Sequence, residues 1–330
     1  MIGLKIRKSS ALARLYQGPQ YPIRDDFAEL RLLRAACTRD TETALSLFCE
    51  HKLFGGTLCA IDTPYRRYEG LAGVRAFVEE WLDVFHGESA EVIPVMQTRA
   101  NGRSVTEAQV RFVVDGEMEE APFFVVADLR TPTTLDEVRI YTHCSFVPGL
   151  QAYRKPIFQS AHLEMGDPGL LTGAVREYYE ALHCVPRADV DRIMDSIGDD
   201  CRFGGYEPDD GAHPPALTRE EIRAKYEMMA NYIPRCVGMR YETIIDDGRT
   251  CVIEWVHIVS RAGREERGRI ALSGIAAYER GSDGRLCSIR ICDYAGLERT
   301  IDWSKLPITL EEAQAVNFVE NFPRGVGRKA

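Results

Sequence analysis

A carboxylate at the end of a predicted strand is the residue best suited to acid–base chemistry in this chain. The stretch 285–294 follows an Asp-Gly turn and alternates in polarity, so that Ile289, Ile291 and Asp293 share one face. A carboxyl group held against apolar walls has a raised pKa and exchanges protons near neutral pH. We therefore predict Asp293 as an acid–base residue, with a solvated strand-end carboxylate as the alternative.

A second predicted strand, 251–260, carries a histidine and a glutamate on opposite faces. Trp255 and His257 share one face, and Glu254 lies on the other. His257 is predicted as an auxiliary proton carrier because imidazole titrates near neutral pH, with a structural or exposed histidine as the alternative. Glu254 is either a cavity carboxylate or an outward residue, since strand alternation prevents Glu254 and His257 from both facing inward without a bulge.

Two adjacent tyrosines on a predicted helix could supply a hydroxyl donor to the same site. Tyr178 and Tyr179 lie between Val175 and Leu182, which recur at helical spacing. Adjacent residues on a helix point in different directions, so we expect one tyrosine in the core and one at the rim. The residues predicted to line the pocket are Tyr179, Glu254, Trp255, Tyr226, Ile291 and Phe203.

The elements that must position these residues occur twice. In each half, two short helices precede Phe-Gly-Gly, a longer helix and three strands, and a capping box of Thr218 and Glu221 opens the longer helix of the second half. Equivalent residues are Phe54 and Phe203 at a separation of 149, Val74 and Ile222 at 148, and Ile140 and Ile291 at 151. Such regular spacing indicates duplication.

The predicted fold class is α+β, with two tandem cone-shaped domains, each having N-terminal helices packed on a curved antiparallel sheet. The predicted divisions are an N-terminal arm (1–22), domain 1 (23–149), a linker (150–171), domain 2 (172–297) and a C-terminal tail (298–330). The arm is expected to be mobile as far as Leu15, since it lacks an apolar targeting segment.

Composition disfavours several classes of function. The 330 residues carry a net charge of −9, which disfavours a nucleic-acid surface. No apolar run reaches the roughly 18–20 residues of a membrane span. The ten cysteines show no zinc spacing, and no phosphate loop or cofactor motif is present. We therefore expect no metal, no cofactor, no nucleic acid or membrane partner, and a cytoplasmic location with reduced thiols.

The second half resembles the nuclear-transport-factor-2-like superfamily, which includes the SnoaL-like polyketide cyclases and the ketosteroid isomerases, and the first half resembles it more faintly. The motifs that carry the resemblance lie at 177–182, 199–203, 283–286 and 293–297. The resemblance implies that Asp293 is an acid–base residue and that Tyr178 stabilises an oxyanion. Where the isomerases have their general base, this chain has Gly204 and Gly205.

Domain 1 is expected to have a degenerate site, because Thr142 stands in the place of Asp293 and Leu32 in that of Tyr178. Two hypotheses follow. The first is a cofactor-independent enzyme that moves a proton on a hydrophobic small molecule, as an isomerase, cyclase or dehydratase. The second is a non-catalytic ligand-binding or interaction module. The resemblance also implies that the two domains dock as an intrachain pseudo-dimer, with a homodimer as a further option.

Overall fold

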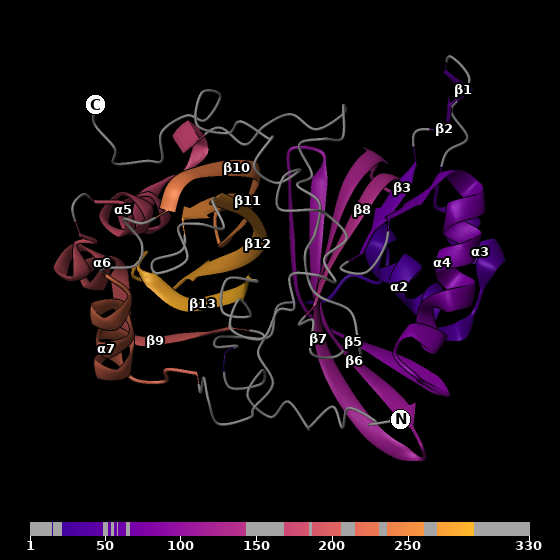
Figure 1. Ribbon diagram of the computed structural model, residues 1–330, viewed down its shortest axis with the longest axis horizontal. Coiled ribbons are helices and arrows are strands. Elements are labelled where there is room, and N and C mark those ends of the chain that lie inside the picture. The colour runs from indigo at the N-terminus through magenta and orange to yellow at the C-terminus, as the bar shows by residue number, and fades with distance from the viewer. Residues whose placement is uncertain are drawn as a thin grey trace. The chain divides into compact units, whose positions relative to one another are not determined.

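The computed structural model describes Leu15 and residues 22–48, 52–53, 56–57, 59–63, 67–142, 168–184, 187–205, 215–230, 236–260 and 269–293. These residues fall into two compact units, which we call domain 1 (22–142) and domain 2 (168–293 together with Leu15). Each unit is α+β, as predicted, with helices packed on its own mainly antiparallel sheet (Figure 1).

The described residues of domain 1 form three helices and a six-stranded sheet, with a separate two-stranded hairpin. The helices are α2 (Ala28–Thr38), α3 (Thr41–Ser46) and α4 (Gly70–Val84). The strands are β1 (Lys52–Leu53), β2 (Gly56–Thr57), β3 (Ala60–Asp62), β4 (Arg67–Glu69), β5 (Ser89–Ala100), β6 (Arg103–Val114), β7 (Glu117–Thr131) and β8 (Thr134–Thr142). The main sheet has the order β4-β3-β8-β7-β6-β5, and only its β3–β8 pair is parallel.

The helices of domain 1 bury apolar stripes against one face of this sheet. On α4, Val74, Phe77 and Trp81 recur at helical spacing, and all three are completely buried. The Trp81 ring packs 5.4 Å from the ring of Phe123 on β7, measured between centroids. Phe85 at the C-terminus of α4 likewise stacks on Phe112 of β6 at 4.8 Å, so the sheet side of this core is aromatic.

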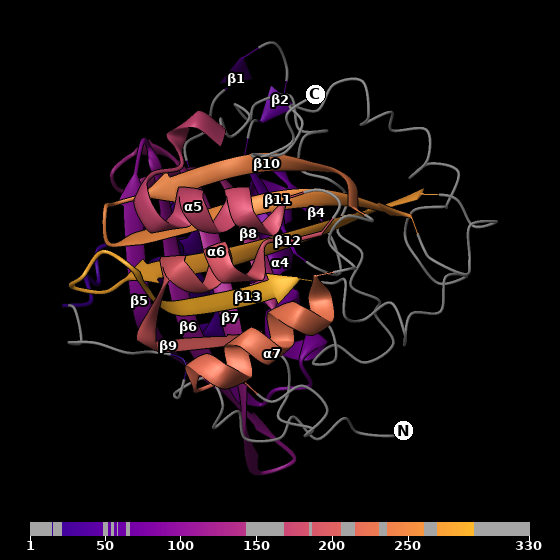
Figure 2. The same ribbon diagram turned by 90° about the vertical axis from the view of Figure 1, so that its left-hand side faces the viewer.

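Domain 2 repeats this arrangement with a five-stranded sheet. Its helices are the 3₁₀ helix η3 (Pro168–Leu170), α5 (Gly173–Leu182), α6 (Val190–Ser196) and α7 (Arg219–Met229). Its strands are β9 (Ile197–Gly205), β10 (Cys236–Asp246), β11 (Thr250–Ser260), β12 (Arg269–Arg280) and β13 (Leu286–Asp293). The sheet order is β10-β11-β12-β13-β9, with a parallel β13–β9 pair at one edge. Figure 2 shows the three α-helices lying across one face of the sheet.

Local sequence explains where the longest helix of the second half begins. Thr218 accepts a hydrogen bond from the Glu221 backbone N–H at 3.2 Å, and the Glu221 carboxylate accepts one from the Thr218 backbone N–H at 3.0 Å. This reciprocal pair confirms the predicted capping box. The bonds hold the pKa of Glu221 below its usual value, the bond from the Leu217 backbone N–H being the largest cause.

Both sheets carry a buried arginine at the equivalent position of one strand, β8 in domain 1 and β13 in domain 2. Arg139 lies 3.0 Å from Asp128, and Arg290 lies 2.9 Å from Glu279, with both arginine side chains completely buried. In each ladder the acid pairs with the residue two positions before the arginine. The arginines and the acids are each separated by 151 residues. This shared register supports the predicted duplication.

Candidate functional site

The two tyrosines of α5 are both buried, each with 2% of its surface exposed. The prediction that one of them lies at the rim is therefore wrong. The physical reason is that both rings pack against the sheet. Tyr178 packs against Tyr278 of β12, with ring centroids 5.2 Å apart, and against Tyr226 of α7 at 5.9 Å. Tyr179 packs against Tyr278 and Tyr241 of the sheet at 5.3 and 5.6 Å.

The hydroxyl groups of these tyrosines are paired with one another inside the core. Tyr226 donates to the hydroxyl oxygen of Tyr178 at 2.8 Å, and the hydroxyls of Tyr179 and Tyr278 are 2.7 Å apart. Burial raises the pKa of Tyr179, Tyr226 and Tyr278 well above the ordinary phenol value. These phenols therefore stay neutral at physiological pH and act as hydrogen-bond donors in a dry environment, where such bonds are strong.

The indole ring of a tryptophan packs directly on a glycine of the neighbouring strand at this core. Trp255 pairs with Gly274 in the sheet, and a Cβ atom at Gly274 would lie 2.7 Å from the indole ring. Gly274 does not have a positive φ, so the position requires glycine for space and not for backbone conformation. The same ladder continues from Gly274 to Asp293, which makes one row across three neighbouring strands.

Domain 1 has the same row with the sizes reversed. Ala108 pairs with Phe123, and Phe123 pairs with Thr142, the residue that stands for Asp293. The large aromatic side chain of the row is therefore Phe123 on β7, the middle of the three strands, in domain 1. In domain 2 it is Trp255 on β11, the first of the three strands. The Thr142 hydroxyl donates to the carbonyl oxygen of Pro122 at 2.7 Å, which is a structural use of that side chain.

Asp293 and His257, the predicted proton carriers, are described only through their backbones. Asp293 is the last residue of β13 and pairs with Gly274. His257 lies on β11 and pairs with Leu272 and Met239. The side chains of both residues lie outside the part of the chain that the structure describes. Their roles therefore stay predictions.

The other predicted lining residues divide between the core and the opposite face. Trp255, Tyr226 and Phe203 are buried members of one apolar cluster, and the half-buried Ile291 packs against it. Glu254 is completely buried, but its neighbours on β11 that belong to the cluster are Ile253 and Trp255, so Glu254 points to the other face of the sheet. There it accepts a hydrogen bond from Thr243 at 2.6 Å. Glu254 therefore does not line the apolar cluster, because strand alternation places it on the opposite, also buried, face of the sheet.

Sequence reasoning missed two tyrosines in domain 2 and one buried acid in domain 1. Tyr241 and Tyr278 are core residues on β10 and β12, and alternation within these strands was the signal that could have found them. Glu29 on α2 is completely buried. It shares a helical stripe with Leu33 and Ala36, a pattern that argues for burial regardless of charge.

The carboxylate of Glu29 is held by hydroxyl groups of the sheet. Ser104 and Thr106 of β6 donate to its two oxygens at 2.7 and 3.0 Å. Burial raises its pKa, while the hydroxyl donors and the positive charge of Arg99 act in the opposite direction. This acid anchors the first helix of domain 1 to the sheet, and nothing in the sequence of domain 2 repeats it.

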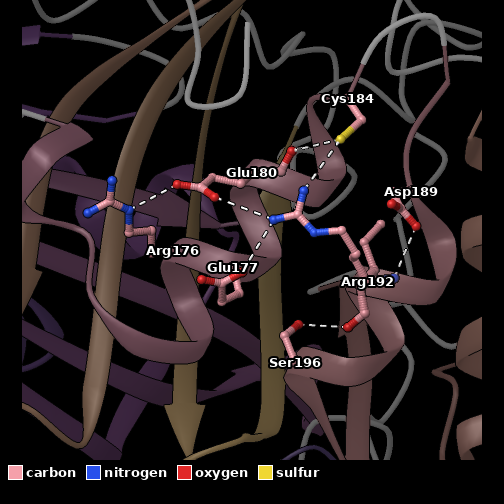
Figure 3. A network of polar contacts seen from close by, with 8 residues as sticks. Arg176, Glu177, Glu180, Cys184, Asp189, Arg192 and Ser196 are labelled. Atoms are coloured by element: carbon pink, nitrogen blue, oxygen red, sulfur yellow. Dashed lines mark hydrogen bonds and ion pairs between the residues drawn. The ribbon is translucent and has the colours of Figure 1, made fainter. Parts of the chain in front are cut away.

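A charged groove of about 380 Å³ lies elsewhere on domain 2, between α5, α6 and the turn before β13. Its lining residues are Ala174, Glu177, Arg192, Asp195, Ser196, Asp283, Gly284 and Arg285. Arg192 reaches from α6 to Glu177 and Glu180 of α5 at 3.3 and 3.4 Å (Figure 3). Arg285 is likewise paired with Asp283 at 2.7 Å. Ion pairs on this surface tie the two helices together, and the apolar cluster remains the better candidate for chemistry.

Among the residues that the structure describes, no group of three or more His, Cys, Asp or Glu side chains is arranged to hold a metal ion. Their helices include none with the length and apolar character needed to cross a membrane.

Comparison with known proteins gives fold likenesses only. No protein-family model matches the sequence, and no curated protein matches it. Solved structures similar to part of the chain include an NTF2-like protein of unknown function from Burkholderia pseudomallei (21% identity, 39% of this chain and 95% of that one, TM-score 0.31). Another is a hypothetical protein with a ketosteroid isomerase-like fold from Catenulispora acidiphila, in complex with trimethylamine (15% identity, 38% of this chain and 95% of that one, TM-score 0.30). A third is a SnoaL-like polyketide cyclase candidate from Shewanella putrefaciens (11% identity, 38% of this chain and 91% of that one, TM-score 0.30). These are the families whose motifs the sequence resembles, and TM-scores this low support no conclusion about activity.

Proposed function

We propose that domain 2 is a cofactor-independent enzyme that moves a proton on a hydrophobic carbonyl compound. The observation that carries this proposal is the bond from the Tyr226 hydroxyl to the hydroxyl oxygen of Tyr178, at 2.8 Å in a fully buried site. A phenol that accepts a hydrogen bond becomes a stronger donor through its own proton. A strong, fixed donor in a dry site is what an enolate-like oxygen requires.

The proposed reaction uses two groups of the chain. The Asp293 carboxylate removes a proton from the carbon next to the carbonyl group, and the electron pair of that C–H bond forms the enolate. Tyr178 donates a hydrogen bond to the enolate oxygen while the negative charge is there. Asp293 then returns the proton to another carbon of the conjugated system, and His257 assists as a proton carrier. Isomerases, cyclases and dehydratases all use this first step.

The walls of the cluster support a hydrophobic substrate. Trp255, Phe203 and Ile291 are apolar, and the ring of Phe203 lies 5.4 Å from that of Tyr226. Apolar walls favour flat, aromatic or polycyclic molecules. They also keep water from the enolate, which strengthens the hydrogen bond from Tyr178.

The test compares two neighbouring tyrosines that differ in partner. Tyr178→Phe removes the proposed donor, and Tyr179→Phe removes an equally buried hydroxyl that pairs with Tyr278 instead. Enolisable polycyclic ketones are screened for exchange of the carbon-bound proton with deuterium from solvent. We expect Tyr178→Phe to lower the rate about 100-fold or more, as for loss of one oxyanion donor, with Asp293→Asn also inactive and Tyr179→Phe close to wild type. Equal rates for wild type, Tyr178→Phe and Asp293→Asn would contradict the proposal.

A second function, non-catalytic binding of a hydrophobic ligand, is favoured by a different observation. Trp255 occupies the space left by Gly274, and four tyrosine hydroxyls of the core are paired among themselves. A fluorescent naphthol separates the two functions. Binding of the naphthol with no exchange activity in wild type, and no change in Asp293→Asn, would favour the binding module. Preferential binding of the ionised naphthol, lost in Tyr178→Phe but not in Tyr179→Phe, would favour the enzyme.

A further inference from the structure

Leu15 of the N-terminal arm is buried in the second domain. Leu15 has 1% of its surface exposed and belongs to domain 2, although it precedes domain 1 in the chain. This burial corrects the expectation of an arm that is mobile as far as Leu15. Burial this complete requires that domain 2 surround the leucine side chain closely, and we call these surroundings its receptor.

The apolar part of that receptor is a space left by a glycine. Gly204 is near the end of the edge strand β9, and a Cβ atom there would lie 2.8 and 3.1 Å from the two methyl carbons of Leu15. The Pro215 ring borders the same space, with its Cβ atom 3.1 Å from that position. Gly204 does not have a positive φ, so glycine is needed for the room it leaves and not for the backbone.

The polar part of the receptor is a chain of buried hydrogen bonds. The Ser288 hydroxyl donates to the backbone carbonyl oxygen of Leu15 at 2.5 Å and accepts from Arg290 at 2.8 Å. Arg290 also donates to Glu279 at 2.9 Å. All three side chains are at most 3% exposed. An ion pair of the sheet is thereby connected to the backbone of the arm, in an environment where each missing partner is costly.

We infer that this surface of domain 2 is a docking site whose partner is the chain's own N-terminal segment at Leu15. The segment acts as a strap on β9, the edge strand that pairs with β13 and with the isolated bridge at Ala216. β9 also carries Phe203, whose ring contacts Tyr226 on the core side. Docking of Leu15 on one face of β9 therefore stabilises the strand that holds one wall of the tyrosine cluster on the other face.

The test uses the full chain and needs no ligand, so its outcome does not depend on the proposed enzyme activity. Leu15→Ala empties the receptor, and Gly204→Ala fills it. Hydrogen exchange of the peptide 197–205 is measured by mass spectrometry. We expect exchange about tenfold faster in each variant, since truncating or displacing a buried leucine weakens contacts by at least that factor. Leu4→Ala, which changes a leucine elsewhere in the arm, is the matched control and should match wild type.

A double variant separates docking from a general disturbance of domain 2. The Cβ atom added by Gly204→Ala meets Leu15 in the wild-type chain but meets the vacated space in Leu15→Ala. We expect the double variant to exchange no faster than Leu15→Ala alone, because the two changes act on one contact. Multiplied effects would show that Gly204→Ala acts through Pro215 instead, and would overturn the assignment of the space to Leu15.

Trypsin supplies an independent measurement, because the bond between Arg14 and Leu15 is a cleavage site. A protease needs several residues around the bond in an extended form, so a docked Leu15 should protect it. We expect cleavage after Arg14 to be slower than after Arg7 in wild type, and the two rates to become equal in Gly204→Ala, in which the cleaved sequence is unchanged. Equal rates already in wild type, together with unchanged exchange in 197–205 for both single variants, would refute the strap.

Discussion

Replacing Glu29 by glutamine should change the stability of domain 1 in a way that depends on pH. The carboxyl group is completely buried and accepts hydrogen bonds from Ser104 and Thr106. Burial raises its pKa above the ordinary value of 4.5, to which it returns on unfolding. Glutamine has nearly the same shape, does not titrate, and can donate and accept among the same hydroxyls.

The sign follows from which state holds the proton. Below pH 4.5 the carboxyl group of Glu29 is protonated in both the folded and the unfolded chain, and above it the folded state retains the proton longer. Stability contributed by Glu29 is therefore fully present at low pH and decreases as pH rises towards the folded-state pKa. One proton gives a slope of at most about 1.4 kcal/mol per pH unit in this window. Glu29→Gln should thus be within about 1 kcal/mol of wild type at pH 4.5 and gain relative stability towards neutral pH.

The assay is hydrogen exchange of peptides covering 28–38 and 103–114, with wild type and Glu29→Gln compared at each pH between 4.5 and 7.5. Intrinsic exchange rates cancel in that comparison, as do other titrating groups. The peptide 286–293 of domain 2, measured in the same sample, is the internal control and should not differ between the two proteins. A difference between wild type and variant that is constant over the whole pH range would refute the argument that burial dominates the pKa of Glu29.

Two further predictions concern domain 2. Gly274→Ala places a methyl group 2.7 Å from the Trp255 ring, so the ring must move. We expect a loss of about 1–3 kcal/mol in the free energy of unfolding, measured by urea denaturation. Adding Trp255→Phe should recover part of this loss, and a Gly274→Ala variant as stable as wild type would show that the indole is not held against this glycine. Thr218→Ala removes the acceptor for the Glu221 backbone N–H and should cost about 1 kcal/mol, whereas Thr218→Ser should cost only a few tenths; equal losses for the two variants in the same titration would contradict a capping role.

The sequence predicted those features that depend on local pattern. Apolar spacing and turn residues predicted the helices and the last three strands of each half, but they missed the strand that precedes them, β5 in domain 1 and β10 in domain 2. The capping box at Thr218 and Glu221 was found at the correct residues. Period-two alternation also placed Glu254 and Trp255 on opposite faces of β11. These patterns are readable because each depends on neighbours within a few positions in the chain.

Features that depend on distant partners were not predictable in the same way. The burial of both α5 tyrosines depends on partners far away in the chain, Tyr278 of β12 for both rings and Tyr226 of α7 for Tyr178. Which of the two faces of β11 belongs to the core is likewise a property of the packed helices and not of the strand. The docking of Leu15 joins residues 273 positions apart, and no local pattern in the arm indicates it.

In domain 1 the small Ala108 pairs with the large Phe123, whereas in domain 2 the large Trp255 pairs with the small Gly274. This reversal of size makes the strands of the two sheets non-interchangeable. A chimaera that moved only the middle strand from one copy to the other would bring two large rings together in one domain and two small residues together in the other. The first hybrid would be overfilled and the second hollow, and both would lose stability. The side-chain sizes on neighbouring strands are therefore matched within each domain, and an exchange between the domains that preserves packing has to move both strands together.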